Sequence, residues 1–146
     1  MSASRRSPTG GFTGCPCAGA TLDKLVQPAI LTVLSQADLH GYRLAQRLAD
    51  MPPFRGRRPD VSGVYRILRD MEARGLVAAS WDLSDRGPAR RLFQMTPAGR
   101  ACLSHWIETL HQYRDAIGGL LAAATRASAE GAQAAPRRAK AASKKG

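Results

Sequence analysis

Three stretches in the first half of the sequence place apolar residues at spacings of three and four, which is the pattern of helices with one buried face. They cover residues 22–34, roughly 41–51 and roughly 61–74. Pro28 lies within the first stretch, where it either kinks the helix or marks its first turn. A turn is expected at residues 38–41. The sequence therefore predicts three consecutive helices, with a tight connection between the first two.

The third helix has start and stop signals of its own. Asp60 or Ser62 can cap its N-terminus, because the short polar side chain of either residue can accept a hydrogen bond from the first turn. Gly75 stands where a C-terminal glycine stop is expected. These signals make the third helix the best bounded of the three.

After this helix the pattern changes to that of strands. Residues 76–81 and 91–95 are predicted strands, and the polar loop 82–89 between them predicts a β-hairpin. Thr96 and Pro97 then open a fourth helix, with the threonine as N-cap and the proline as first helical residue.

The fourth helix carries an apolar stripe that continues for many turns. Its members repeat at threes and fours, and they are Leu103, Trp106, Ile107, Leu110, Tyr113, Ile117, Leu120, Leu121 and Ala124. A domain this small cannot cover so long a stripe, so we expect a second copy of the chain to cover it. Gly118-Gly119 weakens the helix, and a bend or an early end is expected near this pair.

Four residues of this stripe are candidates for a dimer interface or for an effector cavity at the dimer seam: Trp106, Leu110, Tyr113 and Ile117. An aromatic ring such as that of Trp106 can stack on a flat ligand. Ordinary core packing is the alternative for this tryptophan.

The element order is that of a winged helix-turn-helix, so the expected fold is mainly α with a small β-hairpin and a long C-terminal dimerisation helix. The low-complexity ends of the chain are predicted to stay outside it. The predicted domains are a flexible N-terminal arm (1–20), a winged-helix DNA-binding domain (21–96), the dimerisation helix (97–125) and a disordered basic tail (126–146).

The charge of the chain and its placement indicate the partner. The formal net charge is +11, and much of the excess lies at the two ends of the chain. Such a surface attracts polyanions, with nucleic acid first among them. Further arginines gather on the third helix, the loop before it and the hairpin. Solvated arginines coat many exposed faces, but so many on consecutive elements favour double-stranded DNA as the partner.

The third helix is the element that a helix-turn-helix presents to the major groove. Its start and the hairpin therefore hold most of the predicted DNA contacts. The candidates are Arg57, Arg58, Ser62, Gly63, Tyr65, Arg66, Arg69, Arg86, Arg90 and Arg91.

The stretch from about residue 25 to residue 106 resembles the PadR family of bacterial transcriptional regulators. The matching segments are ILTVL (30–34), HGYRL (40–44), VSGVYRILR (61–69), EARGLV (72–77) and GPARRLFQMTPAGR (87–100). Two departures are an arginine at position 66, where the family often has proline, and a phenylalanine at position 93, where tyrosine is common. The first is expected to shift base preference, and the second to change little.

The resemblance implies a homodimer that binds an inverted repeat near a promoter, as a repressor released by a small-molecule effector. It also implies that the start of the third helix contacts DNA and that the hairpin loop follows the backbone. The shortness of the C-terminal part, with one dimerising helix, implies the smaller subgroup of the family.

Cys15-Pro16-Cys17 supports an alternative in which a regulator of the same fold senses a metal or the redox state. Two thiolates do not close a metal site, so other residues of the chain would have to complete it. Cys102, His40, His105 and His111 are the residues that could do so. Two idle thiols in a flexible arm are the simpler interpretation, and no cofactor is expected.

Catalytic motifs are missing from the sequence, which has no glycine-rich phosphate loop, no HExxH and no nucleophile elbow, so the chain is not expected to be an enzyme. No run approaches the roughly 20 apolar residues of a membrane span, and the N-terminus does not resemble a secretory signal. A cytoplasmic protein without a membrane partner is expected. A winged-helix protein–protein interaction module is the hypothesis from another class.

Overall fold

The computed structural model describes residues 24–55, 59–83 and 90–145. The described part is mostly helical and contains a small three-stranded antiparallel sheet, which confirms the predicted fold class. The chain divides into two compact units, residues 1–104 and residues 105–146.

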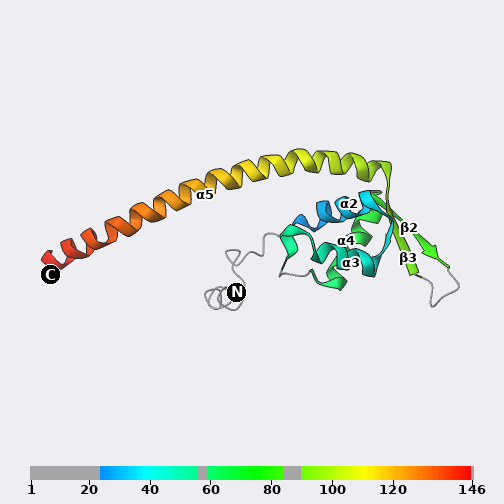
Figure 1. Cartoon of the computed structure of the whole chain (residues 1–146), viewed down its shortest axis with the longest axis horizontal. Helices are drawn as coiled ribbons and strands as arrows, with labels where there is room; N and C mark the ends of the chain where they lie inside the picture. Colours follow the sequence, from blue (N-terminus) through cyan, green and yellow to red (C-terminus); the bar gives the residue numbers. More distant parts are fainter. Residues whose placement is uncertain (1–23, 56–58, 84–89, 146) are drawn as a thin grey trace. The chain divides into compact units, whose positions relative to one another are not determined.

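Helices α2 (Val26–Gln36), α3 (Gly41–Ala49) and α4 (Val61–Ala73) gather in one cluster, with the hairpin strands extending from it (Figure 1). Their bounds confirm the three helices that the apolar pattern predicts. Pro28 is the third residue of α2 and is buried, so it belongs to the first turn, where its missing N–H removes no helical hydrogen bond.

Strands β2 (Val77–Asp82) and β3 (Arg90–Met95) form the predicted hairpin. In its register, Trp81 lies opposite Arg91 and Ala79 lies opposite Phe93. The sheet order is β1-β3-β2, so β3 is the central strand.

The first strand, β1 (Leu39–His40), is a correction to the sequence prediction, which placed only a turn here. It pairs with β3, where Leu39 lies opposite Phe93. A two-residue strand has no period of its own, and its partner lies far along the chain, so the local pattern could not predict it.

Helix α5 (Pro97–Lys145) continues without a break through Gly118-Gly119, so the predicted early end is wrong. Residues 126–145 also belong to this helix, where the sequence analysis placed a disordered tail. Alanine has the highest helix propensity and is abundant on both sides of the glycine pair, which offsets a cost of about 1 kcal/mol for each glycine. Residues 97–104 of α5 group with the first unit, so the boundary between the units lies inside the helix.

The core of the first unit comes from the inner faces of α2, α3 and α4 together with the sheet. Phe54, from the short 3-10 helix η4 (Pro52–Phe54), is also buried. The largest side chains of this core that are fully or almost fully buried are Ile30, Leu31, Leu44, Leu48, Val64, Leu68, Met71, Val77 and Phe93. Burying these faces leaves the opposite side of α4 in solvent, and the candidate site lies there.

Candidate nucleic-acid interface

The start of α4 is held by Asp60, which is the N-cap. Its carboxylate accepts a hydrogen bond from the Ser62 hydroxyl at 2.5 Å and another from the Gly63 backbone N–H at 3.1 Å. These two bonds, the first being the stronger influence, hold the pKa of Asp60 below its ordinary value. A lowered pKa in the folded state means that the cap stabilises α4 above the ordinary pKa, and that this contribution is lost as the pH falls through the lowered value.

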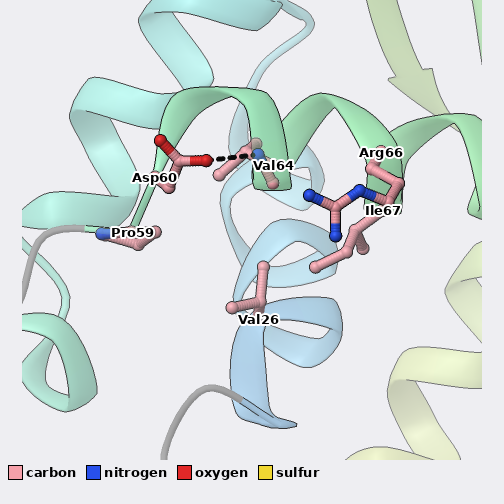
Figure 2. Close-up of a pocket in the computed structure, with 7 residues that line it drawn as sticks. Val26, Pro59, Asp60, Val64, Arg66 and Ile67 are labelled. Carbon is pink, nitrogen blue, oxygen red and sulfur yellow. Dashed lines mark hydrogen bonds between the residues drawn. The ribbon is translucent and has the colours of Figure 1, made fainter.

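A hollow of about 360 Å³ lies between the start of α4 and the start of α2. Figure 2 shows Val26 of α2 facing α4, with the Arg66 guanidinium beside Ile67. The Asp60 carboxylate at its edge is already engaged by the first turn of α4. The hollow therefore belongs to the packing of the capped helix start, and Arg66, which is exposed, lines one side of it.

The outer face of α4 carries four of the predicted contact residues. Ser62, Tyr65, Arg66 and Arg69 are exposed and recur at spacings that place them on one side of the helix. Val64, Leu68 and Met71 are buried on the opposite side. Gly63 is half-buried beside the cap. Arg57, Arg58 and Arg86, the other predicted contacts before α4 and in the hairpin loop, lie outside the described residues.

The ring of Tyr65 packs over Gly41, the first residue of α3. A Cβ atom at position 41 would overlap the far end of the tyrosine ring, so only glycine leaves the ring its place. Tyr65 nevertheless keeps 37% of its surface exposed. The His-Gly-Tyr segment at the start of α3 thus fixes the position of an exposed aromatic ring on α4.

The two arginines at the start of β3 have different surroundings. Arg90 is exposed, whereas the Arg91 side chain forms an ion pair with Glu72 of α4, with Nη2 and Oε2 2.8 Å apart. The difference between the two arginines lies in the Glu72 contact, which only Arg91 is shown to make. Glu72 was not among the predicted site residues. Arg91 and the buried Phe93 are two residues apart on one strand, so their side chains lie on the same face. This pattern could have predicted that Arg91 packs against another element.

Two glycines, Gly75 and Gly99, lie at the junctions that connect the hairpin to α4 and α5. Gly75, with φ +78°, ends α4, and the Leu76 N–H donates to the Met71 carbonyl at 2.9 Å. The Thr96 hydroxyl donates to the Gly75 carbonyl at 2.7 Å, and its oxygen accepts from the Gly99 N–H at 3.0 Å. The Thr-x-x-Gly segment therefore ties the end of the hairpin to the end of α4.

This arrangement, an exposed arginine-bearing helix beside a two-stranded wing, is that of a winged helix-turn-helix. Residues 30–105 match the model of the family described as "Transcriptional regulator PadR-like family". The chain belongs to the PadR-like family. The predicted resemblance is thereby confirmed, and so is the prediction that the chain is not an enzyme, because this is a family of transcriptional regulators.

Individual PadR-like relatives and solved structures agree with this assignment. Transcriptional regulator Rv3488 of Mycobacterium tuberculosis is 34% identical over 91 residues, which cover 62% of this chain and 80% of the relative. The structure of TA0346 from Thermoplasma acidophilum is 25% identical and has a TM-score of 0.61, covering 70% of this chain and 95% of that one. PadR of Bacillus subtilis, solved with operator DNA, shares the fold at 19% identity and a TM-score of 0.51, covering 57% of this chain and 46% of that one.

A second polar contact, between His40 and Asp82, also holds the wing in place. His40 Nε2 lies 2.8 Å from Asp82 Oδ2, so β1 and β2 are joined across β3. Beside this contact is a hollow of about 250 Å³ whose lining includes Tyr42, Trp81 and both Arg90 and Arg91. Tyr42 and Trp81 are both more than 60% exposed. Neither aromatic was predicted as a site residue, although a tryptophan at a strand end beside a polar loop is a signal of exposure.

The cysteine-based alternative has little structural counterpart in this PadR-like chain. Cys15 and Cys17 lie outside the described residues, and within the described ones no group of three or more His, Cys, Asp or Glu side chains could hold a metal. Cys102 accepts a hydrogen bond from Gln27 Nε2 at 3.7 Å. Metal or redox sensing therefore stays a hypothesis. No helix in the described ranges combines the length and apolar character that crossing a membrane requires.

The second unit of the PadR-like chain presents the predicted stripe on α5. Tyr113 and Ile117 are 48% and 63% exposed, and Leu120 is 70% exposed. Trp106 and Leu110 are half-buried. Residues 106, 110, 113, 117 and 120 alternate steps of four and three, which is the spacing of a coiled-coil seam.

Proposed function

We propose that the chain is a sequence-specific DNA-binding regulator in which α4 enters the major groove and the wing follows the sugar–phosphate backbone. The observation that carries this proposal is the outer face of α4, where Ser62, Tyr65, Arg66 and Arg69 are all exposed on one side. Arginine can bind guanine edges with two hydrogen bonds, and a helix fits the width of the major groove. A Bacillus subtilis protein of the same fold was solved in complex with operator DNA, which supports DNA as the partner.

We further propose that the regulator works as a homodimer on an inverted repeat. The exposed seam on α5 supports this, because a stripe of exposed leucine, isoleucine and tyrosine at heptad spacing is stabilised by pairing with a second helix. Two copies related by a two-fold axis present two α4 helices to two half-sites. In the cytoplasm such a dimer acts as a repressor, and a small-molecule effector bound near Trp106 and Leu110 releases it.

The test is the double substitution Tyr65→Ala/Arg66→Ala, with binding measured on the fragment upstream of the protein's own gene and on a scrambled duplex. Losing two base contacts at about 1–3 kcal/mol each should lower the affinity for the fragment by about 30-fold or more. Affinity for the scrambled duplex should fall much less, because phosphate contacts dominate there. The ratio of the two affinities is the quantity to compare.

The matched control is Arg43→Ala/Gln46→Ala, which removes two exposed polar side chains from α3 away from Tyr65. We expect it to leave the ratio unchanged, whatever it does to both affinities. A folded, dimeric Tyr65→Ala/Arg66→Ala protein that keeps the wild-type ratio would refute α4 as the reading element. Wild-type binding that non-specific competitor removes completely would favour the protein–protein module instead.

A further inference from the structure

We propose that Arg91 is a positioning residue that holds the wing against the recognition helix α4, and that it is not a phosphate contact. This inference rests on the proposed DNA-binding function and assigns a separate task to one of its arginines. Arg90, its neighbour on β3, keeps the task of meeting the backbone. From the sequence alone, both residues are predicted DNA contacts.

The first observation is the ion pair between the wing and α4. Arg91 Nη2 lies 2.8 Å from Glu72 Oε2, a normal length for a charge-assisted hydrogen bond. The two side chains are only 39% and 32% exposed, so both are partly withdrawn from solvent. Glu72 lies one residue from the C-terminus of α4, and Arg91 is the second residue of β3. The contact therefore bridges the two elements that have to reach the same DNA.

The second observation is that aromatic rings fix the orientation of the guanidinium. Its central carbon lies 5.7 Å from the Trp81 ring centroid and 5.8 Å from that of Phe93, within the range of cation–π contacts. Trp81 is the cross-strand partner of Arg91, and Phe93 lies two residues further along the same strand face. Nε of Arg91 is buried and has no hydrogen-bond partner among the described residues. The side chain is thus packed between β2, β3 and α4.

The third observation is the small hollow of about 150 Å³ between the wing and α4. Tyr65 and Arg69, two proposed DNA contacts, share its lining with Glu72, Arg91 and Phe93. We therefore expect a change in the Arg91–Glu72 contact to shift neighbouring side chains on the outer face of α4. This proximity gives the ion pair a route to DNA specificity without contact to DNA.

The salt dependence of DNA binding distinguishes a phosphate contact from a positioning residue. An arginine that binds a phosphate releases condensed counterions, and it contributes about 0.9 to the slope of log affinity against log salt concentration. An arginine already neutralised by a carboxylate releases none when DNA binds. Arg90 and Arg91 are adjacent and identical, so each is the natural control for the other.

The experiment compares Arg91→Met/Glu72→Gln, Arg90→Met and Glu72→Gln with the wild type. Fluorescence anisotropy is measured on the upstream fragment and on a scrambled duplex of equal length, at several salt concentrations. Arg90→Met should reduce the salt slope on both duplexes by about 0.9 and weaken both alike. The double variant Arg91→Met/Glu72→Gln removes the ion pair without changing the net charge, so it should leave the slope on the scrambled duplex unchanged and lower the preference for the fragment on the order of tenfold.

Glu72→Gln alone breaks the ion pair with a nearly isosteric side chain, so it guards against misfolding of the double variant. It frees the Arg91 charge, so the scrambled duplex should bind more tightly and with a steeper slope, while the preference for the fragment falls. A salt slope that drops in Arg91→Met/Glu72→Gln as much as in Arg90→Met would overturn the positioning role and make Arg91 a phosphate contact. A wild-type protein that does not distinguish the two duplexes would instead overturn the proposed function together with this inference.

Discussion

Replacing Gly99 with alanine is expected to lower the free energy of unfolding by about 3 kcal/mol, the upper end of what overpacking usually costs. A Cβ atom at position 99 would overlap the Leu76 carbonyl oxygen and come within 2.9 Å of Met95 Cγ. The carbonyl is backbone and cannot rotate away. It also accepts the Thr96 N–H at 3.2 Å, so moving it breaks the junction of α4, the wing and α5.

Thermal unfolding followed by circular dichroism measures this effect, as a fall in melting temperature of roughly 15 °C for a domain of this size. The matched control is Gly118→Ala in the same helix, where an added Cβ meets nothing within 4 Å. That substitution should stabilise α5 by up to about 1 kcal/mol through helix propensity alone. Equal behaviour of the two variants would show that the close approach at Gly99 is not required.

A second large effect is expected from Ile117→Asp, which places a carboxylate in the seam of α5. Two such charges facing each other in a paired seam have to lose water without gaining a partner, so the dimer should dissociate at micromolar concentration. Each monomer then binds a single half-site. Affinity for an inverted repeat should fall by about 100-fold or more, because the second contact is no longer intramolecular.

Sedimentation velocity and gel shift measure the two consequences of this change. Gln112→Asp adds the same charge to an exposed position of α5 outside the seam, and it should leave both the dimer and DNA binding intact. An Ile117→Asp protein that stays dimeric would refute the stripe as the interface. A monomer that keeps full affinity for the DNA would refute the need for two half-sites.

The elements that local pattern determines were predictable from the sequence. The buried faces of α3 and α4 recur at helical spacing, and Asp60 and Gly75 bound α4 where their chemistry requires. The strand β1 was not predictable, because two residues gain their structure only by pairing with distant β3. The full length of α5 was not predictable from Gly118-Gly119 and the low-complexity end, because both are typical of a helix end, whereas the helix propensity of the many alanines sustains the helix.

The sequence predicts which residues make up the candidate site, but it does not predict what each of them does. Arginines at positions 90 and 91 are equivalent in composition, and only the tertiary structure places one beside Glu72 and the other in solvent. In the same way Tyr65 was chosen for its place on α4, whereas its packing over Gly41 depends on how α3 and α4 cross. Such roles depend on contacts between elements that are distant in the sequence. The local pattern of residues contains little information about these contacts.

The most direct test of the account is selection of binding sites by the wild-type protein from a pool of random-sequence duplexes, at about 0.15 M salt with non-specific competitor. At this salt concentration pure charge attraction is already weakened, so enrichment reports base contacts. The account predicts enrichment of one inverted repeat, bound by two copies of the chain. A pool that stays random after repeated rounds, although the protein binds it, would contradict the claim that α4 reads sequence.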